Sequence, residues 1–395
     1  MNELYSEIKA ATDQISAQLI ETRHHLHRHP ELGRVEFETS KYLRNRLESV
    51  NGFEFHTVGE TGFCADLITE RNGPWLVWRA DMDALPIPDE KDVPYKSVNT
   101  GISHACGHDF HSTVALGIAV VLGGLRDKLA GNIRFIFQHA EEPIPGGAID
   151  FVNAGYLDQM KAIFGLHADP GLPVGKIGIS SGWMTAQSIH FKISITGTGG
   201  HSARPNESAD PIFAGMIVLK DLYAGLYRKL DNLSPFVFTV GKITAGDNYN
   251  SIAKNFIAEG TLRVTDPDQS DTLLDMIRLN LINACDIYGL TPDFFYRKGT
   301  PPVINDLKLT EMSREILHQI LNTDQLVEAK RSMGGEDFSS FLEKVPGVFF
   351  RVGVGNEKIS APIHTSLFDI DEQSITFSVK TFSWLLIKLI AINRS

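Results

Sequence analysis

Hydrophobic positions follow two recurring patterns in the first 185 residues of the chain. Short apolar runs, typical of strands buried on both faces, occupy residues 75–79, 133–137 and 162–166. Longer segments with helical patterning, at residues 112–129 and 146–154, separate these runs. Buried strands that alternate with helices are typical of a sheet with helices on both faces. This part of the chain therefore predicts an α/β fold built on a mostly parallel sheet.

The pattern changes in the next hundred residues. Residues 189–195 and 234–240 alternate between apolar and polar positions, and residues 258–264 are predicted to form a further strand. A helix is predicted between the first two strands, from about residue 211 to 230. The order strand, helix, strand, strand, helix, strand is typical of a ferredoxin-like α+β unit.

These patterns divide the chain into two domains. The α/β pattern resumes after residue 296, so residues 1–186 and 297–395 are predicted to form one domain, with residues 187–296 inserted as a second. The size of the chain agrees, because 395 residues with 43% hydrophobic content exceed what a single core usually holds.

Charge and cysteine content exclude several classes of protein. The formal net charge of −11 argues against a nucleic-acid partner, which would need a basic face. The apolar stretch 384–391 is short and contains Lys388, which predicts a core helix and no membrane span. The N-terminal residues lack the pattern of a signal peptide, and three cysteines give no disulfide framework. A cytoplasmic location is expected.

Side chains that favour metal ions gather in a few motifs. A thiol and an imidazole lie two positions apart in residues 104–109 (HACGHD), at a predicted junction between a loop and a helix. Two adjacent carboxylates follow a predicted strand, and they would repel each other unless a cation lay beside them. Such ligands suit zinc and similar ions at a hydrolytic site. The candidate metal-site residues are Cys106, His108, Glu141, Glu142, His167 and His364.

Motifs along nearly the whole chain carry a family resemblance. They are residues 26–33 (LHRHPELG), 79–86 (RADMDALP), 104–109, 138–142 (QHAEE), 199–205 (GGHSARP), 260–263 (GTLR), 335–338 (GEDF) and 364–366 (HTS). The chain resembles the amidohydrolase branch of the carboxypeptidase G and aminoacylase superfamily. That branch includes hippurate hydrolases, N-acetyldiaminopimelate deacetylases and the indole-acetyl-amino-acid hydrolases of plants. The resemblance implies a catalytic domain with two metal ions and an inserted lid domain that mediates dimerisation.

The resemblance also implies roles for the metal-site residues. Cys106 would bridge two divalent metal ions. His108 and Glu142 would complete one metal site, and His167 and His364 the other. Glu141 would act as general base on a water that bridges the two ions. The resemblance favours manganese, the Cys and His ligands favour zinc, and nickel or cobalt would also fit.

Residues of the inserted domain receive roles on the same basis. His201 resembles a histidine that reaches across a dimer to polarise the substrate carbonyl. Asn250 and Arg263 resemble residues that hold the substrate carboxylate. Asp81 and Asp83 are predicted to orient metal ligands, not to bind the ions themselves.

The predicted function is hydrolysis of the amide bond of N-acyl amino acids, with N-acetyl or N-benzoyl groups or similar ones. A metal-dependent dipeptidase or carboxypeptidase is the alternative within the same chemistry. A non-catalytic relative that binds a metal or a ligand is a further alternative, although it would have no use for a base beside a ligand at Glu141 and Glu142. The expected partners are a small-molecule substrate and a second copy of the chain.

Some positions depart from the family pattern or receive no role. His139 stands where the family usually has proline, and Lys254 adds a positive charge to the inserted domain. A group of histidines near the N-terminus precedes Pro30, and its members are predicted to be surface and packing residues. They are His24, His25, His27 and His29.

Overall fold

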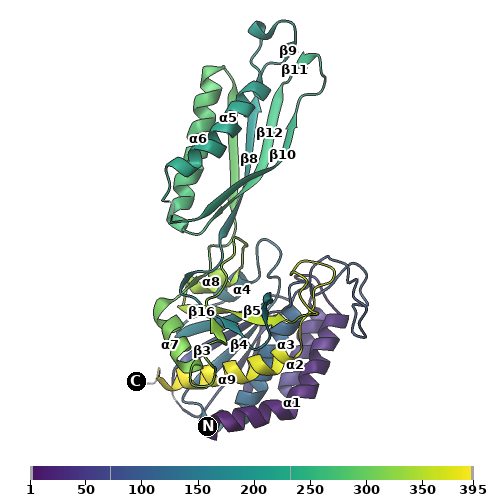
Figure 1. Cartoon of the computed structure of the whole chain (residues 1–395), viewed down its shortest axis with the longest axis vertical. Coiled ribbons are helices and arrows are strands. Elements are labelled where there is room, and N and C mark those ends of the chain that lie inside the picture. The colour runs from purple at the N-terminus through teal and green to yellow at the C-terminus, as the bar shows by residue number, and fades with distance from the viewer. Residues whose placement is uncertain (1–2, 72, 232, 393–395) are drawn as a thin grey trace. The chain divides into compact units, whose positions relative to one another are not determined.

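The computed structural model describes residues 3–71, 73–231 and 233–392. The chain divides into two compact units, and Figure 1 labels most of their helices and many of their strands. Unit 1 comprises Met1–Met184, Val303–Lys330 and Asp337–Ser395, and unit 2 comprises Thr185–Pro302 and Arg331–Glu336. Unit 1 is therefore assembled from segments on both sides of unit 2 in the sequence.

An eight-stranded sheet forms the centre of unit 1, in the order β1-β2-β4-β3-β5-β16-β6-β15. Its four central strands, β4 to β16 in that order, are parallel, and antiparallel pairs flank them. The α/β class and the parallel-rich sheet predicted from the apolar runs are thus confirmed. The strands are β1 (Phe53–Val58), β2 (Gly62–Leu67), β3 (Trp75–Asp81), β4 (Asn132–Gln138), β5 (Ala162–Pro173), β6 (Ile177–Gly178), β15 (Leu326–Val327) and β16 (Gly347–Gly355). A separate short pair joins β7 (Gly182–Trp183) to β14 (Ile304–Asn305).

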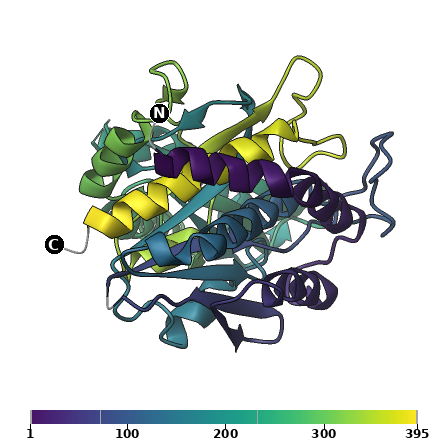
Figure 2. The same cartoon turned by 90° about the horizontal axis from the view of Figure 1, so that it is seen from below.

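Helices cover both faces of this sheet. On one face α1, α3 and α9 pack against one another and against the strands, as Figure 2 shows. On the other face α4 and α8 contribute phenylalanines to a second apolar cluster with β5 and β16. The helices of unit 1 are α1 (Glu3–Arg28), α2 (Phe37–Glu48), α3 (His108–Gly124), α4 (Ala148–Asn153), α7 (Leu307–Leu317), α8 (Phe338–Leu342) and α9 (Gln373–Ile392), with a short 3-10 turn at Arg126–Lys128.

Helix α9 is apolar enough to be compared with a membrane span. It is the one helix among the described residues with sufficient length and hydropathy, and 67% of its most apolar window is buried inside the protein. Its side chains pack on α1, α3 and β16 in the main apolar cluster. This is the environment of a core helix, as the sequence predicted.

Unit 2 has its own sheet and core. Four antiparallel strands lie in the order β10-β12-β8-β13, and α5 and α6 pack against the face that carries Ile189, Phe191 and Ile193. The elements run strand, helix, strand, strand, helix, strand along the chain, which makes the unit ferredoxin-like. They are β8 (Gln187–Thr196), α5 (Pro211–Gly225), β10 (Phe236–Ala245), β12 (Asn255–Val264), α6 (Pro267–Ile287) and β13 (Thr291–Lys298). A small pair joins β9 (Gly200–His201) to β11 (Ser251–Ile252), and 3-10 turns lie at Pro205–Glu207 and Leu226–Arg228.

The parallel strands of unit 1 direct their carboxyl ends to one edge of the sheet. Strand β3 ends at Asp81, β4 ends at Gln138, and β5 passes through His167. In α/β sheets ligands bind outside the carboxyl ends of the strands. The loops that follow β3 and β4 therefore bring polar side chains to this edge.

Candidate metal centre

Cys106 and His108 lie at the start of α3, on either side of Gly107. Gly107 has a left-handed φ of 92°, and a Cβ there would lie 3.1 Å from the Cβ of Ala168. Glycine tolerates both the left-handed φ and the close approach of Ala168, because it lacks a Cβ. The tight turn places the thiol and the imidazole together at the first turn of the helix.

The sulfur of Cys106 lies at the centre of a group of imidazole nitrogens. Its Sγ is 3.4 Å from His167 Nε2 and 3.2 Å from His364 Nε2. His364 Nε2 is also 3.5 Å from Glu142 Oε1, and His108 Nε2 is 3.9 Å from the same oxygen. The fold therefore brings together all five residues predicted as metal ligands.

Two groups of donor atoms can be recognised in this cluster. The donors of Cys106, Glu142 and His364 lie within 4.8 Å of one another, and so do those of His108, Glu141 and Glu142. Glu142 takes part in both groups. Donors at this spacing can converge on an ion placed between them.

Hydrogen bonds fix the histidine rings so that Nε2 faces the cluster. The Nδ1 of His167 lies 2.7 Å from the carbonyl oxygen of Ala168 and donates to it. The Nδ1 of His108 lies 3.2 Å from Asp83 Oδ1. A proton on Nδ1 leaves the Nε2 lone pair available, which is the usual arrangement of histidine ligands.

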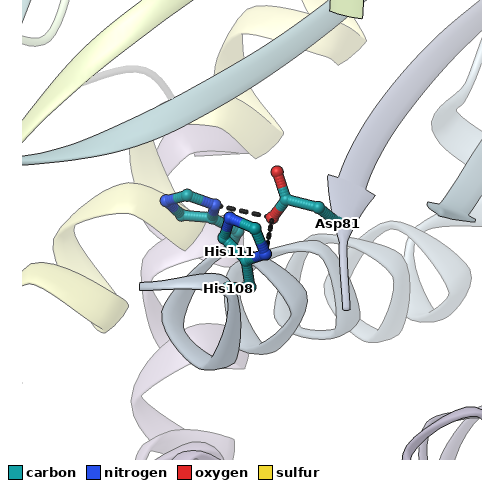
Figure 3. A group of neighbouring side chains, drawn as sticks. All are labelled: Asp81, His108 and His111. Atoms are coloured by element: carbon teal, nitrogen blue, oxygen red, sulfur yellow. Dashed lines mark hydrogen bonds and ion pairs between the residues drawn. The ribbon is translucent and has the colours of Figure 1, made fainter. Parts of the chain in front are cut away.

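Asp81 and His111 support this arrangement from behind. His111 Nδ1 lies 2.7 Å from Asp81 Oδ1, and His111 Nε2 accepts a hydrogen bond from the backbone N–H of Ala168. Figure 3 shows Asp81 beside the rings of His108 and His111. Arg79 donates to the other oxygen of Asp81 at 2.7 Å. Because its oxygens are engaged in these contacts, Asp81 acts as a partner of the histidines.

Asp83 connects His108 with the loop that carries both glutamates. Its Oδ1 accepts from the backbone N–H of Glu141, and its Oδ2 accepts from that of Glu142, each at 3.0 Å. One buried carboxylate thus orients an imidazole and two consecutive residues of the loop.

Burial shifts the pKa of several groups in the cluster. Burial raises the pKa of the Cys106 thiol well above its usual value, and burial raises the pKa of Glu142 to about 7. Burial also lowers the pKa of His167 and His364, which favours neutral imidazoles. Among the described residues, Glu142 Oε1 is a buried oxygen with no hydrogen-bond partner. Divalent cations would pair with that oxygen and favour the thiolate, so this donor set suits metal binding.

Two buried networks near the cluster were not predicted. Arg79 is almost fully buried and donates to Asp81, Gln138 and Asp337, which lie on or beside three different elements. The sequence offered one signal for this network, the charged Arg79 in the apolar run 75–79, because a buried arginine requires hydrogen-bond or ion-pair partners.

The second network surrounds one of the N-terminal histidines. His27 was predicted to be a surface or packing residue, and it is a buried one, held in a charged network that the sequence pattern did not indicate. Its side chain is fully buried, with Nδ1 2.6 Å from Asp109 and Nε2 3.2 Å from Asp89. Arg23 also donates to Asp109, the residue that follows His108.

His139, which stands where the family usually has proline, is buried, and its Nε2 lies 2.9 Å from Asp150 Oδ2.

The remaining predicted site residues lie in unit 2. His201 is exposed on β9, and its neighbouring strand β11 begins just after Asn250. Arg263 lies near the end of β12 and donates to the carbonyl oxygen of Met333 at 2.8 Å. Asn255 and Arg263 are eight residues apart on β12, which is about 26 Å along a strand. Unit 2 therefore places His201 and Asn250 near one end of its sheet and Arg263 near the other.

The chain is similar in sequence to known proteins over most of its length. Residues 77–388 match the model of the family described as Peptidase family M20/M25/M40. An N-acetylcysteine deacetylase from Bacillus subtilis is 36% identical over 373 residues, which cover 94% of this chain and 96% of that protein. Thermostable carboxypeptidase 2 from Saccharolobus solfataricus is 33% identical over 391 residues, which cover 98% of this chain and 99% of that protein.

A solved structure gives the same relationship in three dimensions. A Bacillus subtilis protein described as a dinuclear metal binding peptidase from the M20 family matches with a TM-score of 0.85 and 33% sequence identity. The match covers 96% of this chain and 99% of that chain.

Proposed function

The chain belongs to peptidase family M20/M25/M40, in its amidohydrolase branch, and on that premise we propose that it hydrolyses the amide bond of N-acyl amino acids. The observation that carries this proposal is the convergence of five metal-binding side chains beside a further carboxylate, Glu141. A closed structural metal site would have no use for that additional group.

Glu141 is the proposed general base. Its Oε2 lies 3.9 Å from His108 Nε2, and its side chain is 11% exposed, so it faces the cluster and has little access to bulk solvent. When bound, two divalent cations would lower the pKa of water and polarise the amide carbonyl. Glu141 would accept the proton of the attacking water and deliver it to the leaving nitrogen.

The proposed centre would hold two divalent metal ions, with Cys106 as a ligand of both. The contact between His364 Nε2 and Glu142 Oε1 supports pairing these two residues around one ion, which leaves His108 and His167 for the other. This differs from the pairing inferred from the sequence, where Glu142 was assigned with His108. Manganese is the proposed metal, with zinc, nickel or cobalt as possible substitutes because imidazole, thiolate and carboxylate ligands accommodate each of them.

A second copy of the chain is the proposed partner, and the proposed interface is unit 2, acting as lid and dimerisation domain. Helix α5 presents a row of exposed apolar side chains, and strand β10 is an edge strand of the sheet. Both features are typical of association surfaces. The exposed side chains on and just after α5 are Phe213, Met216, Tyr223 and Tyr227.

The proposed substrate is a small anion with a free α-carboxylate. Arg263 offers a guanidinium for that carboxylate. Asn250, near the opposite end of the unit 2 sheet, would hold the carboxylate from the partner, and His201 of the partner would polarise the substrate carbonyl. The deacetylase relative supports an N-acyl amino acid. Because the three cysteines are free and buried, we propose that the reaction takes place in the cytoplasm.

A carboxypeptidase or dipeptidase is the second candidate. It is favoured by the carboxypeptidase relative, which matches nearly the whole chain. Both candidates use the same base and metal centre, so substrate comparison must separate them.

A substrate screen tests the proposal. N-acetyl, N-benzoyl and indole-acetyl amino acids are compared with dipeptides after each metal is added back to the metal-free protein. We expect the fastest turnover with an N-acyl amino acid, and a tenfold to hundredfold loss, roughly, when its carboxylate is amidated. Faster turnover of dipeptides would favour the second candidate, and equal turnover of acid and amide would reject the carboxylate anchor.

A further inference from the structure

A short N-terminal segment, residues 31–36, packs against the loops that carry the catalytic carboxylates. It precedes the residues that match the family model. The carbonyl oxygen of Glu31 accepts from the N–H of Ala84, next to Asp83. A Cβ on Gly33 would lie 3.1 Å from the Cα of Ala140, so the two backbones are in close contact there.

Glu36 makes the most direct of these contacts. Its side chain is buried, and Oε1 accepts a 2.7 Å hydrogen bond from the backbone N–H of Ala140. Its Oε2 accepts a 2.7 Å hydrogen bond from the hydroxyl of Thr61. Each oxygen therefore has a specific partner, as a buried carboxylate requires.

Ala140 needs such a partner because its backbone is strained. It has a left-handed φ of 51°, a conformation that residues with a Cβ rarely adopt. Such conformations persist where surrounding contacts enforce them. Glu141, the proposed base, follows immediately.

Three consecutive backbone N–H groups are held by buried carboxylates. Glu36 accepts from Ala140, while the two oxygens of Asp83 accept from Glu141 and Glu142. Asp83 also contacts His108, so it serves the metal site directly. The side-chain hydrogen bonds of Glu36 join it to Thr61 and to the Ala140 N–H, so its effect on the reaction would pass through the Ala140 backbone.

We propose that Glu36 is a positioning residue that holds Ala140 in its left-handed conformation and thereby orients the Glu141 carboxylate for proton transfer. This role rests on the proposed function of Glu141. It differs from a role in metal binding, because Glu142 lies one residue further from Ala140 than Glu141 does, and its N–H would still donate to Asp83 when Glu36 is changed.

Four variants separate this role from a general structural one. Glu36→Gln keeps an oxygen for the Ala140 N–H and offers an amide N–H to Thr61, whereas Glu36→Ala removes both contacts. Thr61→Val removes only the Thr61 hydroxyl. Glu38→Ala is the matched control, because Glu38 lies two residues further on, in the first turn of α2, where its side chain is 75% exposed and pairs with Lys41.

We expect Glu36→Ala to lower kcat with an N-acetyl amino acid by about tenfold to a hundredfold, with KM within about twofold and two metal ions still bound. Glu36→Gln should stay within about threefold of the parent, and Thr61→Val and Glu38→Ala should be close to it. Hydrogen–deuterium exchange at residues 140–142 should be faster in Glu36→Ala and unchanged in Glu38→Ala.

Three results would overturn the proposal. These are an unchanged kcat in Glu36→Ala, a loss of metal that matches the loss of activity, and an equal loss of kcat in Glu36→Gln and Glu36→Ala. If Glu36→Ala does not fold, Glu36→Asp takes its place, since the shorter side chain cannot reach both partners. If the parent hydrolyses no N-acyl amino acid, the proposed function fails, and the exchange measurement still decides whether Glu36 holds this backbone.

Discussion

Cys106 is the residue at which the candidate metal ligands meet. Its sulfur contacts the Nε2 atoms of His167 and His364, which come from a strand and from a C-terminal loop. Burial raises the pKa of this thiol, so its thiolate form depends on cations beside it. If one side chain binds both metal ions, its removal should weaken the binding of both.

Cys106→Ala is therefore expected to lose both metal ions together. Metal content per chain, measured by plasma emission after gel filtration, provides the readout. Cys64→Ala is the matched control, because Cys64 is also fully buried but lies in β2 among apolar side chains. Two metal ions retained in Cys106→Ala would show that the sulfur is not the shared ligand.

The two adjacent glutamates should respond differently to the same change. Glu141→Gln removes the proposed base and is expected to keep both metal ions while kcat falls about a hundredfold or more. Glu142→Gln replaces a donor near His108 and His364 and is expected to lower the metal content. The opposite pattern, with metal lost in Glu141→Gln alone, would exchange the two roles.

The candidate metal ligands were easier to predict from sequence than the residues that orient them. Cys106, His108 and the paired glutamates lie in short motifs whose chemistry is visible in the sequence. Glu36 is more than a hundred residues from Ala140 along the chain, and its burial follows from packing that no local pattern encodes. The same holds for Arg23, whose partners Asp109 and Asp369 are 86 and 346 residues away.

At the scale of elements, helix α1 is attached to the catalytic unit by charges as well as by apolar contacts. Arg23 donates to Asp109 at the start of α3 and to Asp369, which follows His364 by five residues. His27, one turn further along, lies between Asp109 and Asp89. This helix therefore links the two chain segments that carry His108 and His364.

Three central strands of the sheet were predicted correctly, because a run of apolar residues indicates a buried strand. The runs at residues 75–79, 133–137 and 162–166 became β3, β4 and β5. Strand β1 and helix α2 were not predicted, since their burial is partial and their patterning is weaker. Pairing between distant strands, such as β16 with β5, also lies outside what a local pattern contains.

The charged network of α1 should make stability depend on acid pH. Burial would raise the pKa of Asp89, but the hydrogen bonds from His27, the Ser97 N–H and Lys91 hold it well below its usual value. A depressed carboxyl pKa adds stability above the pKa of the unfolded chain, and this contribution is lost as the pH falls below it. Asp89→Asn is expected to lower the free energy of unfolding by about 2 kcal/mol at pH 7, with a smaller deficit at pH 3.5.

Urea unfolding of parent and variant at pH 7, 5 and 3.5, in the same metal state, checks this expectation. The exposed Asp92→Asn serves as control and should match the parent at each pH. A deficit of Asp89→Asn that is the same at all three pH values would mean that packing, and not the ionised carboxylate, provides the stability.

At the scale of the whole molecule, unit 2 separates residues that the family resemblance assigns to one substrate. His201 lies beside β11 near the start of β12, and Arg263 lies near the end of β12, about 26 Å further along the strand. A small N-acyl amino acid is far shorter than this distance. One copy of unit 2 therefore cannot offer both residues to the same substrate, which favours a site completed by His201 from a second copy.

A mixing experiment tests this arrangement. Glu141→Gln and His201→Ala are each expected to be nearly inactive as pure proteins. After exchange of subunits, a mixed dimer has one site with both an intact Glu141 and an intact His201 from the partner. Random exchange of equal amounts makes about half of the dimers mixed, so activity should recover to about a quarter of the parent value. Exchange can be verified with differently tagged chains. Absence of recovery after verified exchange would mean that His201 acts within its own chain or has no role in the reaction.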